Sequence, residues 1–127
     1  MSVPLSATDL AFVNGVAARR WADREPAAAD ERSLEAALAD AAATEGTPFL
    51  RIATLAGALL RRHAFPSAPL PTALLVLHCA LALEGFVLIA PQGVAAGMIR
   101  AVAGDGDGDA ITLARWLEDR AVPSASG

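Results

Sequence analysis

The sequence predicts an all-α protein, a single compact bundle of about six helices around a central buried helix. Apolar residues recur at helical spacing along most of the chain, and residues typical of helix starts and helix ends separate the apolar stretches. A chain of 127 residues, 54% of them hydrophobic, is long enough to bury one core. We therefore expect one helical domain over residues 1–122 and a flexible tail over residues 123–127, whose composition is small and polar.

Polar caps mark the starts of the first two predicted helices. Ser6 and Asp9 have the spacing of a capping box. The inward side of the helix that follows is formed by Leu10, Val13, Ala17 and, at its end, Trp21. Asp30 or Ser33 can cap the second helix, and Gly46 ends it. The residues of the second helix expected to face inward are Leu34, Leu38 and Ala41.

The third predicted helix begins at Thr47-Pro48, an N-cap residue followed by proline at the first helical position. Its apolar stripe consists of Ile52, Leu55, Ala56 and Leu59. The same spacing continues to His63, so we expect this histidine to point toward the interior or a pocket.

Residues 65–71 contain three prolines and predict a loop, after which the fourth helix runs from about Thr72 to Glu84. Gly85 is the expected C′ residue of that helix. The fifth helix begins at Pro91, with one face made by Val94, Met98, Ile99 and Val102. Asp109 is the expected N-cap of the sixth helix, whose apolar residues are Ile111, Leu113, Trp116 and Leu117.

Composition narrows the partners and the compartment. There are 10 Lys and Arg residues against 14 Asp and Glu residues, so the net charge is -4, and no basic block occurs. Nucleic-acid binding is therefore disfavoured. The single cysteine, Cys79, excludes an internal disulfide and suits a reducing compartment. No charged segment precedes an apolar stretch at the start, so we expect no secretion signal and a cytoplasmic location.

Residues 70–90 are apolar enough to suggest a transmembrane helix and are about long enough to cross a bilayer. Four residues interrupt the run: Pro71, His78, Glu84 and Gly85. We interpret it instead as the central helix, buried on most sides by its neighbours, and expect no membrane partner.

Metal sites are not favoured by the sequence, and we expect no cofactor. The alternating glycine and aspartate residues at 104–109 resemble a calcium-binding loop. An EF-hand loop that began at Asp105 would need Gly at its sixth position and Glu at its twelfth, where this chain has Ala110 and Trp116. A zinc site made by His63, His78 and Cys79 would lack a fourth ligand. Adjacent helical residues point about 100° apart, so His78 cannot activate Cys79 as a nucleophile.

The stretch from His63 to Leu74 resembles the signature of the Fic/Doc (death-on-curing) family, which reads His-x-Phe-x-Asp/Glu-Gly/Ala-Asn-Lys/Gly-Arg and in the Doc branch is followed by Thr-Ala-Leu. The matching residues are His63, Phe65, Ala68, Thr72, Ala73 and Leu74. Residues 30–39, 102–104 and 113–117 resemble further helices of the family, so the likeness covers most of the chain. The resemblance implies a Doc-like helical bundle.

The sequence departs from this signature at its charged positions. Ser67 stands where the family has the acidic residue that holds Mg²⁺, and Pro69, Leu70 and Pro71 stand where its phosphate-binding residues lie. Serine lacks the charge that a hard cation prefers, and proline lacks an amide donor. We therefore expect ATP-dependent phosphoryl or adenylyl transfer to be lost. An altered transfer, with one of three other arginines replacing the missing one, is an alternative: Arg61, Arg62 or Arg100.

The resemblance implies that His63 is the general base of the family's reaction. An isolated interior histidine is otherwise more often a structural hydrogen-bonding group, and both interpretations stay open. Arg61 and Arg62, which precede it, are interpreted as solvated residues at a helix end, where the dipole favours cations. The expected substrate-binding residues are Phe65, Ser67, Pro69, Leu70, Thr72 and His78.

Two hypotheses of function follow. In the first, replacement of the charged motif made an apolar pocket that binds a small molecule, and His63 acts as acid and base in a cofactor-free isomerisation, elimination or cyclisation of specialised metabolism. In the second, the protein is an inactive Doc-like toxin component or regulatory module that binds a protein partner such as an antitoxin. A homodimer is also expected to be possible for a small, strongly hydrophobic domain.

Overall fold

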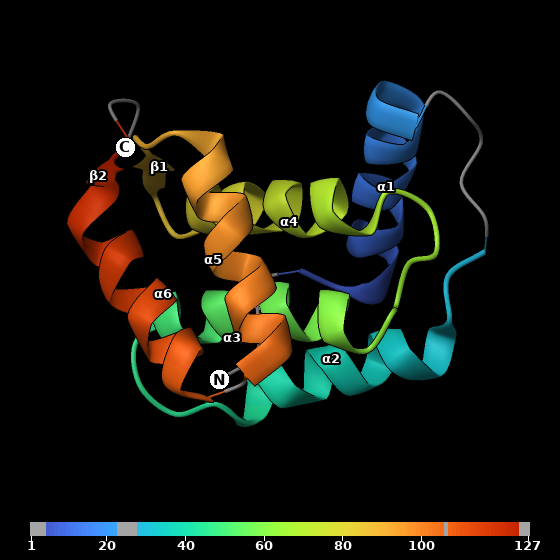
Figure 1. The fold of residues 1–127 in the computed structure, drawn as a ribbon, viewed down its shortest axis with the longest axis horizontal. Helices are drawn as coiled ribbons and strands as arrows, with labels where there is room; N and C mark the ends of the chain where they lie inside the picture. The colour runs from blue at the N-terminus through green and yellow to red at the C-terminus, as the bar shows by residue number, and fades with distance from the viewer. Residues whose placement is uncertain (1–4, 23–27, 106, 125–127) are drawn as a thin grey trace.

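The computed structural model describes residues 5–22, 28–105 and 107–124, and it confirms the all-α prediction with 74% helix. The elements in chain order are α1 (Ala7–Ala17), the π-helix η1 (Ala18–Ala22), α2 (Glu31–Ala43), α3 (Pro48–Arg61), α4 (Pro69–Leu83), β1 (Phe86–Leu88), α5 (Gln92–Asp105), α6 (Asp107–Arg120) and β2 (Ala121–Pro123). Figure 1 shows the helices gathered into one bundle.

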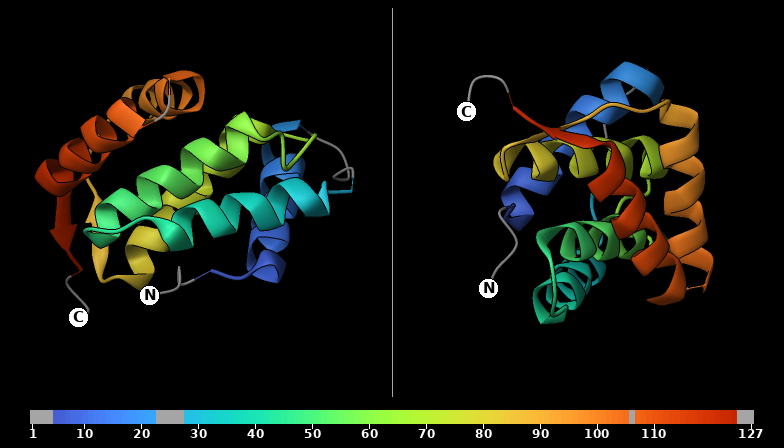
Figure 2. Two further views of the ribbon diagram at one scale, coloured as in Figure 1. Left: turned by 90° about the horizontal axis from the view of Figure 1, so that it is seen from below. Right: turned by 90° about the vertical axis from the view of Figure 1, so that its left-hand side faces the viewer.

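The helix at the centre of the bundle is α3. It packs against α2, α4, α5 and α6, and Figure 2 shows α2 lying alongside it. The predicted apolar stripe of α3 is buried, as are most residues between Arg51 and Leu59. Residues 70–90 were predicted to form the central helix, but α4 leaves Leu83 exposed and packs mainly on α3, with fewer contacts to α1, β1 and α5. No helix within the described residues is both long and apolar enough to cross a membrane.

Close packing of α3 on α5 depends on Gly57. A Cβ atom built at this position would lie 2.2 Å from Val102 Cγ1 and 2.8 Å from Val102 Cβ. Only a residue without a side chain allows the two helices to approach this closely.

The predicted caps of the first three helices are confirmed. The Ser6 hydroxyl accepts from the Asp9 backbone N–H at 3.2 Å, and Asp9 Oδ2 accepts from the Ser6 backbone N–H at 2.9 Å. This second bond lowers the pKa of Asp9. Asp30 accepts from the Ser33 N–H at 3.0 Å, and Thr47 accepts from the Leu50 N–H at 3.3 Å.

Helix α4 begins at Pro69, earlier than the predicted Thr72. The prediction was wrong because prolines are tolerated in the first turn, where the backbone N–H groups have no intrahelical acceptor. Both Pro69 and Pro71 lie in that turn. At the other end, Gly85 has a φ of +88° and follows the last turn, as predicted.

Trp21 is 52% exposed, although the sequence predicted that it would continue the inward face of the first helix. The chain changes from α-helix to π-helix after Ala17. Hydrogen bonds between residues i and i+5 interrupt the 3.6-residue period, so Trp21 does not lie on the same buried face as Leu10 and Ala17. The Arg20 guanidinium lies 5.5 Å from the centre of the Trp21 ring, within the range of a cation–π contact.

The last two helices also differ in detail from the prediction. Helix α6 begins at Asp107, so Asp109 lies within its first turn instead of capping it. Val94 and Ile111 are exposed, and their expected places in the core are taken by neighbouring residues. Among the residues of α5 and α6 whose burial the structure describes, the buried ones are Ala95, Ile99, Val102, Ala110, Leu113, Ala114 and Leu117.

A two-stranded antiparallel sheet joins β1 to β2, with Val87 opposite Val122. Pro123 was predicted to belong to a flexible tail, whereas it pairs with Phe86 in this sheet. The Ser124 N–H donates to the Gly85 carbonyl at 2.8 Å. The remaining tail residues, 125–127, lie outside the described part of the chain. Strands of three residues are too short to give a periodic signal in the sequence.

Candidate functional site

The predicted site residues lie in three separate places. His63, Phe65 and Pro69 border one cavity. Leu70 and His78 border another. Ser67 and Thr72 belong to a buried polar cluster between α1 and α4.

His63 terminates α3. It has a φ of +54°, and its N–H donates to the Leu60 carbonyl at 3.2 Å. The N–H of Ala64 donates to the Leu59 carbonyl, also at 3.2 Å. These two bonds define a Schellman motif with His63 at the C′ position, which usually holds glycine. The side chain is exposed and borders a wide cavity of about 630 Å³, so it faces a pocket and not the interior.

Replacement of His63 by glycine is expected to stabilise the protein by roughly 0.5–1 kcal/mol. A side chain in the left-handed region costs about 1–2 kcal/mol, which is partly offset by the greater entropy of glycine in the unfolded chain. Urea unfolding would measure the change. His63→Ala is the matched control, because it also removes the imidazole but keeps the Cβ atom. Equal stabilities of the two variants would contradict the assignment of His63 as the C′ residue.

The buried polar cluster holds the motif loop against α1. Asn14 Nδ2 donates to the Ser67 carbonyl at 2.8 Å and to Thr72 Oγ1 at 2.9 Å, and Thr72 Oγ1 donates to the Ala68 carbonyl at 2.7 Å. Asn14, Ser67 and Thr72 are all buried. Both N–H groups of the Asn14 amide therefore have an acceptor.

Asn14 was not among the predicted site residues, although the sequence contains a signal for it. Asn14 lies four residues after Leu10 and three before Ala17, which places it on the buried side of α1. A polar residue on such a face needs a hydrogen-bond partner. Its partners come from the loop and α4, so Ser67 and Thr72 stabilise the fold at the positions where substrate contacts were predicted.

A smaller cavity, of about 200 Å³, lies between η1, α4 and α5. Its walls are mainly apolar and are formed by Trp21, Leu70, Pro71, Leu74, Leu75, His78 and Ala96. His78 is half-buried, and its Nε2 atom is buried without a hydrogen-bond partner. Among the described residues, every other buried side-chain nitrogen or oxygen has a partner. Burial lowers the pKa of His78, because the surroundings disfavour the charged imidazolium. The imidazole is therefore neutral at pH 7.

Acidification is expected to destabilise the protein through His78. Its folded-state pKa lies below the unfolded value of 6.5, so the unfolded chain takes up a proton first. The stabilisation is complete above pH 6.5 and is lost as the pH falls through the folded-state pKa. Melting temperatures between about pH 7 and about pH 5, where exposed carboxylates stay ionised, would show this loss.

The control variants separate the two histidines of the chain. His78→Leu is expected to flatten the pH dependence, and His63→Ala to leave it close to that of the unmodified protein. An equally steep fall in His78→Leu would show that another group carries the effect.

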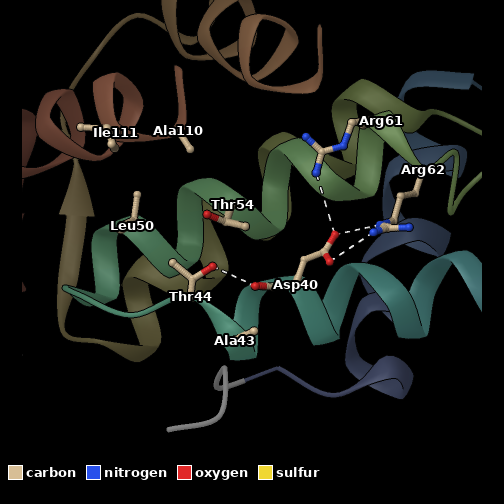
Figure 3. A pocket seen from close by; sticks show the side chains of 9 residues that line it. All are labelled: Asp40, Ala43, Thr44, Leu50, Thr54, Arg61, Arg62, Ala110 and Ile111. Atoms are coloured by element: carbon tan, nitrogen blue, oxygen red, sulfur yellow. Dashed lines mark hydrogen bonds and ion pairs between the residues drawn. The ribbon is translucent and has the colours of Figure 1, made fainter. Parts of the chain in front are cut away.

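A third cavity lies between α2, α3 and the start of α6 and contains a charged cluster (Figure 3). Arg62 contacts both carboxylate oxygens of Asp40, with Nε at 2.8 Å from Oδ2 and Nη2 at 3.2 Å from Oδ1. Arg61 lies farther away, with Nη2 at 3.8 Å from Asp40 Oδ2. An ion pair therefore connects the end of α3 to α2. Arg61 and Arg62 are also exposed to solvent, as predicted.

Residues 5–22, 28–105 and 107–124, which the structure describes, contain no group of three or more His, Cys, Asp and Glu side chains that could hold a metal ion. Cys79 is half-buried and forms no disulfide bond. The fold and cavities thus define a helical bundle with a small apolar cavity beside a neutral histidine.

Comparisons of the chain with protein-family models, curated proteins and solved structures found no match. The Fic/Doc resemblance, the homodimer and the protein partner stay predictions from the sequence.

Proposed function

We propose that this protein binds an apolar small molecule in the cavity beside His78. The observation that carries the proposal is the combination of apolar walls with one buried, unpartnered imidazole nitrogen among the described residues. A buried polar atom without a partner is costly, and a ligand that supplies a hydrogen bond removes that cost. The histidine of the proposed site is therefore His78 and not the motif residue His63.

The size of the cavity limits the ligand. A cavity of about 150 Å³ lined by apolar side chains can hold benzene. The cavity beside His78, about 200 Å³, suits a single-ring compound with a short substituent. Because Nε2 is buried, the imidazole turns about its soft Cβ–Cγ bond to meet the ligand. A hydroxyl is the complementary polar group, since it donates to or accepts from a neutral imidazole.

The start of α4 supports the proposed loss of ATP-dependent transfer. Anion sites at helix starts are built from free backbone N–H groups. Pro69 and Pro71 have none, and the Thr72 N–H donates to the Ala68 carbonyl at 3.0 Å. Ser67 is buried, and its carbonyl accepts from Asn14. These features leave little at the motif that neutralises a phosphate.

The proposal keeps a Doc-like origin for the bundle. The motif begins at His63, just after α3 ends, and continues through a tight loop into the first turn of α4, where the resemblance places the family's phosphate-binding residues. Acid and base chemistry by His63 stays a prediction from the resemblance. The His63 side chain is exposed, and its left-handed backbone conformation lies at the end of α3.

Titration with 4-ethylphenol and ethylbenzene tests the proposed binding. Trp21 borders the cavity, so its fluorescence reports occupancy once the second tryptophan is removed by Trp116→Phe. We expect saturable binding of 4-ethylphenol. His78→Leu is expected to weaken it by roughly 5- to 150-fold, the equivalent of about 1–3 kcal/mol for a lost buried hydrogen bond, and to leave ethylbenzene binding nearly unchanged.

His63→Ala is the control that separates the two histidines. If His63→Ala weakens 4-ethylphenol binding and His78→Leu does not, the ligand lies at the motif loop and the proposed site is wrong. Absence of saturable binding by either compound up to millimolar concentration would contradict the binding function itself.

A further inference from the structure

We infer that the cavity between α2, α3 and α6 is a second binding site, for a small organic carboxylate with an unbranched apolar body. It differs from the His78 cavity in both position and chemistry, so the inference stands independently of the proposed function. The cavity has a volume of about 460 Å³, within the range of small-molecule sites. Its charged and apolar residues lie at opposite ends (Figure 3).

The charged end of the cavity has two arginines but one carboxylate. Asp40 is the one acidic residue among those lining the cavity, against Arg61 and Arg62. Arg62 contacts both oxygens of that carboxylate at hydrogen-bond distance. Arg61 stays at 3.8 Å, too far for a hydrogen bond. The Arg61 guanidinium can therefore turn to a ligand carboxylate without breaking the pair between Arg62 and Asp40, and it offers planar, two-point contact.

The opposite end of the cavity is apolar. Leu50 of α3 and Ala110 and Ile111 of α6 line it, and Ile111 is 45% exposed in spite of its apolar side chain. Thr54 lies on α3 between this end and Arg61 (Figure 3). A ligand body placed over Leu50 and Ile111 would remove apolar surface from water.

The spacing along α3 sets the length of the ligand. Arg61 lies seven positions after Thr54 along α3, which at a rise of 1.5 Å per residue corresponds to roughly 10 Å. A carboxylate held at Arg61 with a chain reaching past Thr54 therefore has a medium-length body. Octanoate is the probe that matches this length and charge.

Three probes separate the two parts of the site. Octanoate has both the carboxylate and the apolar body, acetate has only the first, and octanol has only the second. We expect octanoate to shift the backbone amide signals of Thr54 and Ile111 in a saturable way in ¹H–¹⁵N NMR spectra. Acetate and octanol are expected to bind at least about 5-fold more weakly, and binding of octanoate to weaken at high ionic strength.

Arg61→Gln is expected to weaken octanoate binding at least about 5-fold and to leave octanol unchanged. Arg100→Gln is the matched control, because Arg100 is an exposed arginine of α5 outside the cavity lining. Arg61 is exposed, so Arg61→Gln is expected to fold, which circular dichroism would verify. Equal octanoate affinity in Arg61→Gln, equal affinity for octanol and octanoate, or shifts confined to the residues around His63 or His78 would each overturn the inference.

Discussion

Replacement of Gly57 by alanine is expected to lower the free energy of unfolding by about 1–3 kcal/mol. Alanine favours a helix by about 1 kcal/mol over glycine, so the expected sign depends on packing. The new Cβ atom would lie 2.2 Å from Cγ1 and 2.8 Å from Cβ of Val102, whose side chain is buried. Rotation of Val102 cannot relieve the second contact, because Cβ does not move with χ1. The α3 and α5 helices therefore have to separate, which disturbs the centre of the bundle.

The matched control for this prediction is Gly97→Ala. Gly97 lies within α5, and a Cβ atom built there meets nothing within 4 Å. Chemical denaturation is expected to show that Gly97→Ala stabilises the protein by about 0.5–1 kcal/mol. Adding Val102→Ala to Gly57→Ala is expected to recover part of the loss, since the two positions are in contact. If Gly57→Ala stabilised the protein as much as Gly97→Ala, α3 and α5 could not be as close as described.

Replacement of Asn14 by alanine is the second change with a large expected effect, a loss of about 1–3 kcal/mol. It removes the donor to the Ser67 carbonyl and to Thr72 Oγ1, both of which are buried. The Ser67 carbonyl then loses a bond that solvent cannot easily replace. We expect the loop before α4 to loosen, with faster amide hydrogen exchange at Phe65, Ser67 and Ala68.

A double-mutant cycle with Thr72→Val isolates the bond between the two side chains. The coupling energy is expected to be about 0.5–3 kcal/mol, as for directly contacting residues. Thr8→Ala, an exposed change on the same helix, is expected to alter stability by less than about 0.5 kcal/mol. A coupling energy near zero would mean that Asn14 and Thr72 act independently.

Local signals were sufficient to predict most helix boundaries. Ser6, Asp30 and Thr47 cap their helices as expected because a cap involves only residues within one turn. Gly85 ends α4 for the same reason. Predictions that relied on a fixed helical period were less accurate where the winding changes, as at Trp21 after the π-helix.

The candidate sites depended on contacts between distant segments, which the sequence pattern does not specify. Leu70 and His78 share a cavity because η1 and α5 complete its walls. Ser67 and Thr72 were expected to contact a ligand, but both bind Asn14 instead. His63 was predicted to face either the interior or a pocket, and it borders a pocket, whereas its left-handed backbone conformation could not be read from helical spacing.

The position of α1 has a consequence for synthesis of the chain. Asn14 finds its acceptors 53 and 58 residues later, and apart from η1 the helix packs chiefly on α4. At about 5–20 residues per second, the ribosome completes that surface roughly 3–12 s after α1 emerges. During this interval α1 lacks the helix on which it packs most, and its surface residue Phe12 is 74% exposed even in the finished fold. Helix α1 therefore waits longer for its main partner than α2 does, because α2 packs on α3, the next helix along the chain.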